Sequence, residues 1–188
     1  MRRKMVAVAL ACVSALVVAA PAAQAQDSAD SESPSPVVAS SSRARADHPV
    51  QSVGHLVGRI RIPDIGLDTA VRAGVAIEVI DQGPAHWVGT AQPGETGNVV
   101  IAGHRTTHSA PFRQLDQLEP GSLIYLTNPR DFEVMYRVTE TFIVEPKDIW
   151  ITYETSQPML TMFACHPLGS AAQRIVVRAE LLAGRLIA

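Results

Sequence analysis

The chain has 188 residues, of which 47% are hydrophobic and 18% are charged, and its formal net charge is −2. This length and apolar content suit one globular domain with a tail. The low net charge and the lack of clustered Lys and Arg argue against nucleic-acid binding, because phosphate contacts need a basic face.

Residues 1–25 have the composition of an export signal. A basic start over residues 2–4 precedes an uncharged apolar run over 5–20, and Ala23-Gln24-Ala25 fits a cleavage site with small residues. The alternative is a membrane anchor, since the apolar run approaches the ~20 residues that span a bilayer. Both interpretations predict an exported domain, on the outer side of the cytoplasmic membrane or in the cell wall, and the second adds association with the membrane.

Residues 26–52 are rich in Ser, Pro, Ala and Asp. A segment of this composition buries too little apolar surface to offset the entropy lost on ordering. We therefore predict a disordered linker over 26–52 and a globular domain over 53–188.

The globular part shows the period-two patterns of short strands. A half-exposed strand is expected over 55–62, a second over 65–71 and a buried strand over 98–103. Residues 75–80 are ambiguous between a strand and a helical turn. Further strands are expected over 122–127 and 132–138, with 139–144 as a continuation or a separate strand, and then over 159–164 and 174–182.

Phe112, Leu115 and Leu118 have helical spacing after Pro111, which predicts a short helix over 111–118. No alternation of strands with long helices is present, so parallel strand–helix–strand units are not expected. The predicted fold class is therefore all-β, a closed antiparallel barrel of about eight strands with one or two short helices.

The two cysteines are Cys12 and Cys165, and removal of the export signal would leave Cys165 alone. A lone cysteine in an exported protein is buried and inert, paired with another chain, or reactive. Cys165 follows the apolar run 160–164 and precedes His166-Pro167, so it lies at a predicted strand end, where side chains become accessible.

Two other strand ends carry polar residues. His104 follows the buried strand and a glycine, and glycine allows a backbone or ligand to approach closely. Arg174 begins the last strand, where an arginine beside a cysteine can hold a carbonyl oxygen. Arg178 is the alternative, because positions four apart share a face of a strand. Our hypothesis is that Cys165, His104 and Arg174 form one active site.

The histidines also raise the question of a metal site, since the residue types that bind zinc include His86, His104, His108, Cys165 and His166. The pair four residues apart, His104 and His108, would need a helix to converge, whereas Pro111 favours a loop. The acidic residues do not have the spacing of a calcium loop. We therefore expect no metal and no cofactor.

Four separated motifs resemble one family. Residues 98–107, NVVIAGHRTT, followed by Ala110-Pro111-Phe112, resemble the histidine segment of sortases, most closely class E. Residues 161–167, TMFACHP, with Arg174 downstream, resemble the Thr-Leu-x-Thr-Cys segment of that family and its arginine. Residues 62–67 and 83–94 resemble two further sortase motifs, so the resemblance covers about 53–182.

This resemblance implies an eight-stranded sortase barrel and a cysteine transpeptidase. It implies that Cys165 is the nucleophile, His104 the acid/base partner and Arg174 the group that orients substrate or stabilises the oxyanion. The implied substrates are surface proteins with a C-terminal sorting signal of the Leu-Pro-x-Thr-Gly or Leu-Ala-x-Thr-Gly type, cleaved between Thr and Gly. The implied acceptor is an amine of a peptidoglycan precursor or a pilin.

Two positions depart from the family pattern: Ala164 replaces a threonine, and His108 replaces a tyrosine common in class E. With Thr106 and Thr107, they are the candidate substrate-binding residues. The alternative function is a catalytically weak sortase-like barrel that binds wall or peptide. An L,D-transpeptidase would need a Ser-His-Gly-Cys run, and a papain-like peptidase would place its cysteine before its histidine, so neither enzyme fits.

Overall fold

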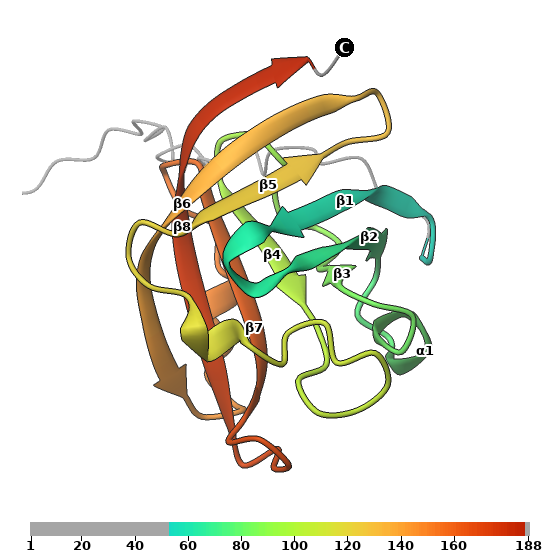
Figure 1. The fold of residues 1–188 in the computed structure, drawn as a ribbon, viewed down its shortest axis with the longest axis vertical. Helices are drawn as coiled ribbons and strands as arrows, with labels where there is room; N and C mark the ends of the chain where they lie inside the picture. The colour runs from blue at the N-terminus through green and yellow to red at the C-terminus, as the bar shows by residue number, and fades with distance from the viewer. Residues whose placement is uncertain (1–52, 187–188) are drawn as a thin grey trace, which may run out of the picture. The chain divides into compact units, whose positions relative to one another are not determined.

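The computed structural model describes residues 53–186, and the expected export signal (1–25) and linker (26–52) lie outside this part of the chain. The described residues form eight strands that close into a barrel in the order β1-β2-β3-β4-β7-β8-β6-β5 (Figure 1). This closure confirms the predicted fold class of an eight-stranded barrel.

The strands agree with the predicted segments to within a few residues, except for the very short β3. Residues 77–80 form the one-turn helix α1, which resolves the segment that was ambiguous in the sequence, and three 3-10 turns cover Pro63–Ile65, Leu115–Gln117 and Ile149–Thr152. None of the helices within residues 53–186 is long and apolar enough to cross a bilayer. The strand bounds are β1 Leu56–Ile62, β2 Leu67–Ala73, β3 Ala85–His86, β4 Asn98–Ala102, β5 Leu123–Thr127, β6 Phe132–Val144, β7 Met159–His166 and β8 Gln173–Leu186.

The expectation of a purely antiparallel barrel is wrong, because β2 pairs with β3 and β4 pairs with β7 in parallel. Parallel neighbours need a long crossover connection, which is usually a helix. Between β4 and β7 the chain instead builds β5 and β6, which lie elsewhere in the barrel (Figure 1). The sequence therefore lacks the helical pattern that would have indicated a parallel pair.

The helix predicted over 111–118 is also wrong in type. This segment consists of turns followed by the 3-10 turn at Leu115–Gln117. Phe112, Leu115 and Leu118 are nevertheless all buried. The spacing correctly indicated which side chains face the core. It could not distinguish an α-helix from a succession of turns, because both place these three side chains on one face.

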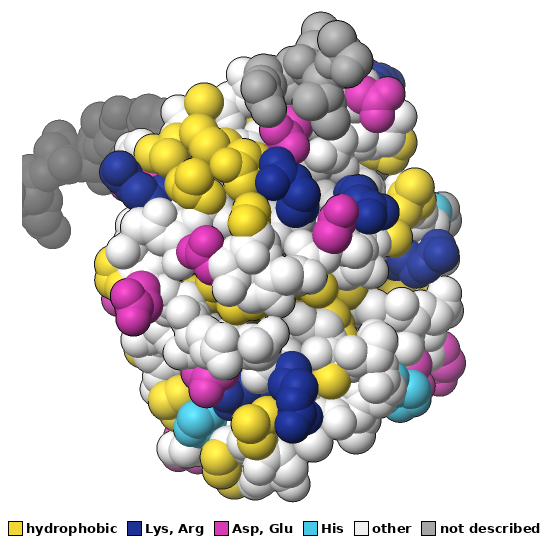
Figure 2. All heavy atoms as spheres, viewed as in Figure 1, with side chains coloured by type: hydrophobic (Ala, Val, Ile, Leu, Met, Phe, Trp, Pro, Cys, Tyr) yellow, Lys and Arg dark blue, Asp and Glu magenta, His cyan; other side chains and the backbone are white. Residues whose placement is uncertain are grey.

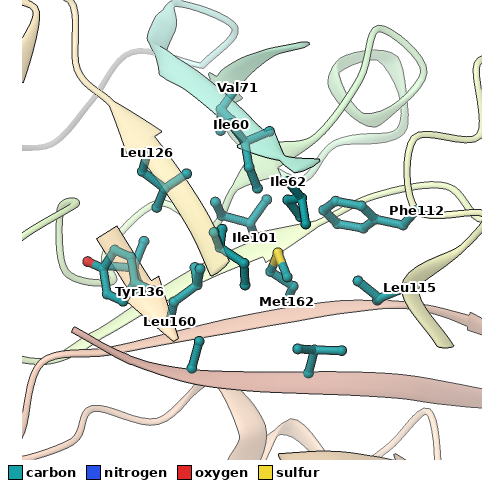
Figure 3. Packing of buried hydrophobic residues seen from close by; sticks show 14 of the residues in the cluster. Ile60, Ile62, Val71, Ile101, Phe112, Leu115, Leu126, Tyr136, Leu160 and Met162 are labelled. Atoms are coloured by element: carbon teal, nitrogen blue, oxygen red, sulfur yellow. The ribbon is translucent and has the colours of Figure 1, made fainter. Parts of the chain in front are cut away.

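The barrel interior is filled by aliphatic side chains from every side of the wall. Ile60 and Ile62 from β1, Ile101 from β4, and Leu160 and Met162 from β7 converge there (Figure 3). Each is at most 1% exposed, and burying such a side chain contributes about 2 kcal/mol. This packing fixes which residues of β7 point inward.

The outer face of β7 and β8 is also covered. Val144, Ile151 and Val176 form a second buried cluster, against which Phe142 and Phe163 pack. A strand buried on both faces reads as a nearly continuous apolar run rather than an alternating one. This explains the apolar run that ends at Cys165.

Asn98 fixes the register of the parallel pair β4 and β7. Its amide Nδ2 donates to the carbonyl oxygens of Ile151 and Tyr153, each at 3.0 Å. Its Oδ1 accepts a hydrogen bond of 2.7 Å from the Thr161 hydroxyl of β7. All three bonds are made by a residue that is 1% exposed, so sliding either strand would leave buried polar groups unpaired.

A separate surface feature lies over β5, β6 and β8, where hydrophobic side chains gather beside basic and acidic ones (Figure 2). A shallow pocket of about 280 Å³ is lined there by Tyr125, Glu133, Met135, Ala183 and Gly184. Met135 pairs with Ala183, near the end of β8 opposite Arg174. This pocket is therefore distinct from the site described next.

Candidate active site

Strand register brings the three proposed catalytic residues together. The parallel pairing of β4 with β7 sets Ala102 opposite Phe163, and the N–H of Gly103 donates to the Phe163 carbonyl at 3.2 Å. Two residues beyond this pair, His104 and Cys165 therefore lie at the same end of the two neighbouring segments, with Cys165 still inside β7. On the other side of β7, the antiparallel register places Arg174 directly opposite Cys165.

All three residues line one pocket of about 240 Å³ on the outer face of the barrel wall. Successive side chains of a strand point to opposite faces. Ala164 belongs to the interior cluster, so Cys165 points outward, and a directly opposed residue such as Arg174 shares that face. We call this the apolar pocket, and its lining residues are Ile77, Ile80, Ala102, Gly103, His104, Phe163, Ala164, Cys165 and Arg174.

Cys165 and His104 also line a second pocket, of about 200 Å³, which we call the polar pocket. Its other lining residues are Arg105, Thr106, Thr107, Gly169, Ser170 and Ala171. The hydroxyl of Thr106 accepts a hydrogen bond of 3.0 Å from the N–H of Gly169. This bond joins the loop after β4 to the loop between β7 and β8, so the two loops form one wall.

The candidate substrate-binding residues lie around these pockets in different ways. Thr106 and Thr107 are exposed and border the polar pocket. His108 lies farther along the same loop and its side chain is 49% exposed. Ala164 borders the apolar pocket but is only 3% exposed, so its methyl group belongs mainly to the core.

His104 is held by an acid that the sequence pattern did not indicate. Its Nε2 lies 2.7 Å from Oδ1 of Asp81, which caps the C-terminal end of α1. The His108 ring stacks on the His104 ring, with centroids 4.9 Å apart, and its Nδ1 lies 3.3 Å from the same carboxylate oxygen. The expectation that the two histidines need a helix to converge is therefore wrong.

The loop achieves this convergence through unusual backbone angles. His108 has φ 54° and Ala110 has φ 43°, both in the left-handed region that residues with a Cβ rarely adopt. The chain thus turns back sharply after Thr107. Three groups capable of metal binding, on Asp81, His104 and His108, end up within 4.8 Å of one another.

Arg105 is a second residue that sequence analysis missed. Its side chain is 2% exposed, and its guanidinium contacts Asp116 Oδ1 at 2.9 Å and His166 Nδ1 at 2.8 Å. It therefore connects the segment after His104 to the residue that follows Cys165. A buried arginine of this kind has no sequence signal that separates it from a surface arginine.

The two candidate arginines have different surroundings. Arg174 donates from Nη1 to the carbonyl oxygens of Ala171 and Gln173, at 2.9 and 2.8 Å. Arg178 lies over the rings of Phe142 and Trp150, at 5.4 and 5.1 Å from their centroids. Only Arg174 of the two lines the apolar pocket, whereas Arg178 packs on the aromatic cluster outside the wall.

The sortase domain family matches residues 60–182, which include β4, β7 and the first ten residues of β8. The chain belongs to the sortase family. The resemblance drawn from the sequence motifs is thereby confirmed at the level of the family, and the sortase barrel at the level of the fold.

Individual sortases match at modest identity. Sortase D of Bacillus subtilis is 28% identical over 128 residues, which make up 66% of this chain and 63% of that protein. Sortase SrtE1 of Streptomyces coelicolor is 24% identical over 141 residues, or 67% of this chain and 40% of that protein. The chain thus spans less than two thirds of the length of each curated relative.

A solved structure supports the same conclusion. The sortase D5 transpeptidase of Clostridium perfringens is 30% identical and superposes with a TM-score of 0.64, covering 70% of this chain and 82% of that chain. Because class D and class E sortases both match, the comparisons support the family and the fold. Membership of class E stays a prediction.

Proposed function

We propose that this chain is a cysteine transpeptidase that cleaves a sorting signal of the Leu-Pro-x-Thr-Gly or Leu-Ala-x-Thr-Gly type between Thr and Gly. It then joins the new C-terminus to an amine of a peptidoglycan precursor or a pilin. The observation that carries the proposal is the register of β4, β7 and β8, which brings His104, Cys165 and Arg174 to one pocket.

In the first step the Cys165 thiolate attacks the carbonyl carbon of the threonine, since the thiolate rather than the thiol is the nucleophile. The carbonyl oxygen gains a negative charge as the tetrahedral intermediate forms. Arg174 has a planar guanidinium with five N–H donors, of which Nη1 is anchored by the carbonyls of Ala171 and Gln173. The anchored guanidinium is preorganised to stabilise the oxyanion.

In the second step the Thr–Gly carbon–nitrogen bond breaks, and the leaving glycine amine takes a proton from the His104 imidazolium. A thioester between Cys165 and the threonine remains. The acceptor amine then attacks this thioester, returns a proton to His104 and releases the thiolate. Asp81 holds Nε2 of His104 at 2.7 Å, so it orients the ring and leaves Nδ1 for these transfers.

The pockets on either side of Cys165 suit different parts of a peptide. Ile77, Ile80 and Phe163 make the apolar pocket fit for an aliphatic side chain such as the leucine of the signal. The polar pocket offers the hydroxyls of Thr106, Thr107 and Ser170. We assign substrate binding to these two surfaces, with His108 at the edge of the site.

The test uses the full chain with Leu-Pro-x-Thr-Gly and Leu-Ala-x-Thr-Gly peptides and a glycine-based amine acceptor. Intact mass spectrometry should show a thioacyl adduct on the wild type, and chromatography should show the transpeptidation product. Cys165→Ala should lose both. Peptide binding with neither adduct nor product contradicts the proposal and supports the binding-module alternative.

The arginine assignment has a matched control on the same strand. Arg174→Ala should lower kcat/KM by about 10²–10³, the range seen when one oxyanion-stabilising donor is removed. Arg178→Ala removes the same group four residues away and should leave kcat/KM close to the wild-type value in the folded fraction. Equal losses in both variants contradict the role of Arg174.

We also propose that the chain acts outside the cytoplasm, on surface proteins and wall or pilin acceptors. The support is the family and the signal-like composition of residues 1–25. N-terminal sequencing of the protein from the producing cells tests this proposal. A mature chain that begins at Gln26 indicates cleavage, an intact N-terminus in the membrane fraction indicates an anchor, and an intact chain in the cytoplasm contradicts export.

A further inference from the structure

We propose that Asp81, His104 and His108 form a binding site for a divalent transition metal, with Zn²⁺ as its probe. The site would use Oδ1 of Asp81, Nε2 of His104 and Nδ1 of His108, whose donor atoms lie within 4.8 Å of one another. The resemblance that predicted the catalytic residues assigns no metal here, and it has a tyrosine where this chain has His108.

Two of the three spacings between donor atoms are close to those of a zinc site, and the third is at most 4.8 Å. Tetrahedral zinc with bonds of about 2.0–2.2 Å holds neighbouring donors about 3.4 Å apart. Oδ1 of Asp81 lies 3.3 Å from Nδ1 of His108 and 2.7 Å from Nε2 of His104. A metal that replaces the proton in the shorter contact needs the two atoms to separate by less than about 1 Å.

The surrounding structure fixes the carboxylate and leaves all three groups accessible. Asp81 is fixed at the end of α1 by its own backbone hydrogen bond to Ile77. The two imidazole rings are stacked within 20° of parallel, so one ring must rotate for both nitrogens to face the same ion. The side chains of Asp81, His104 and His108 are 32%, 17% and 49% exposed. A metal ion can therefore reach the donors without unfolding of the loop.

The donor set also selects the class of metal. Imidazole nitrogens suit Zn²⁺, Cu²⁺ and Ni²⁺, whereas Mg²⁺ and Ca²⁺ prefer six or more oxygen ligands. Two nitrogens and one carboxylate oxygen match the three-ligand pattern of zinc sites that keep an open fourth position. We therefore expect Zn²⁺ to bind and Ca²⁺ and Mg²⁺ not to compete.

The consequence for activity rests on the proposed function. His104 is the residue that transfers protons to and from the amines, and a metal on its Nε2 fixes the ring in a neutral, ligating state. The imidazolium that protonates the leaving glycine cannot form while the metal is bound. Metal binding should thus inhibit transpeptidation reversibly, and a chelator should restore it.

Binding is tested with the full-length Cys165→Ala protein without a polyhistidine tag, so that neither a reactive thiol nor added histidines contribute. Competition with a chromophoric zinc chelator should give one Zn²⁺ per chain. His108→Phe retains a ring that can stack on His104 but lacks the nitrogen donor, and Asp81→Asn retains shape but lacks the charge. Each should weaken Zn²⁺ binding by at least about tenfold, since loss of even an outer partner costs that much.

His55→Asn is the matched control, because it removes an imidazole outside the cluster and should leave Zn²⁺ affinity unchanged. Circular dichroism checks that every variant is folded. Three results would overturn the proposed site: no stoichiometric Zn²⁺ binding, binding lost in Cys165→Ala, or binding that is unaffected by both His108→Phe and Asp81→Asn. Competition by equimolar Ca²⁺ or Mg²⁺ would overturn the assigned metal class.

The activity arm separates this inference from the proposed function. Wild-type enzyme should lose transpeptidation as Zn²⁺ is added and regain it with chelator, whereas His108→Phe should resist the same Zn²⁺ concentration by about tenfold. If the metal-free enzyme makes no thioester, the proposed function fails while the binding result still decides the site. If Zn²⁺ occupies the site and the rate is unchanged, the inhibitory role is refuted.

Discussion

Gly103, the residue before His104, should not tolerate a side chain. A Cβ at this position would lie 2.6 Å from Cδ2 and 2.8 Å from Cε2 of Phe112, where ordinary contacts are 3.4–4 Å. Phe112 is fully buried, so its ring cannot rotate into solvent. The N–H of Phe112 also donates to the His104 carbonyl at 3.0 Å, so displacement of Phe112 shifts the loop that carries His104.

We expect Gly103→Ala to lower the free energy of unfolding by about 2–3 kcal/mol, the upper part of the range for overpacked cores. Misplacing a catalytic group by about 1 Å can cost about 10²-fold in rate. The variant should therefore lose about that factor in kcat/KM at a temperature where it is fully folded. Urea unfolding gives the stability, and the peptide transpeptidation assay gives the rate.

Two companion variants test whether the contact with Phe112 causes the losses expected for Gly103→Ala. Phe112→Leu removes the clashing ring, so the double variant should be more stable than the sum of the single effects by at least about 1 kcal/mol. Gly184→Ala creates a clash at a similar distance, 2.7 Å from Cζ of the half-buried Phe132, about 30 Å along β8 from Arg174. It should lose stability without losing kcat/KM. Additive effects of Gly103→Ala and Phe112→Leu would refute the reasoning.

Two further predictions concern stability. Burial raises the pKa of Tyr136 to about 12, above the unfolded value of about 10. The neutral Tyr136 side chain therefore contributes to the free energy of unfolding below pH ~10, and this contribution is lost as pH rises from about 10 to 12. The loss should approach about 3 kcal/mol in urea unfolding, and Tyr136→Phe should remove this pH dependence; an unchanged profile contradicts it. Asn98→Ala should lower the free energy of unfolding by about 3 kcal/mol, since it leaves two carbonyls and the Thr161 hydroxyl unpaired, whereas Thr161→Val should cost about half as much. A loss below about 0.5 kcal/mol for Asn98→Ala would contradict the buried network.

The barrel was predictable because its strands carry local patterns. The apolar residues 98–102 and 160–164 mark buried strands, and Arg59 and Arg61 alternate with Ile60 and Ile62 as expected for β1. The pairing of β4 with β7 was not predictable, because parallel neighbours are distant in the chain and no helix marks the crossover. Local pattern therefore identified the strands but not all of their neighbours.

The site was predictable only in part for the same reason. Cys165, His104 and Arg174 could be selected as candidates because they stand at strand ends within recognisable motifs. Asp81 ends a helix of a single turn, and its contact with His104 depends on how α1 lies against the loop after β4. The burial of Arg105 likewise depends on partners in two distant segments, Asp116 and His166, which no local pattern expresses.

The parallel pairing of β4 with β7 has a kinetic consequence. The proposed nucleophile, Cys165, and the proposed acid/base residue, His104, belong to segments with β5 and β6 between them, so the two residues cannot come together until most of the barrel has closed. Contacts of this kind form late, because loop closure must precede them. A chain that is still unfolded holds a cysteine but no arranged partners, so catalytic competence should appear only with completed folding, and a partly folded molecule should not cleave the proteins it meets.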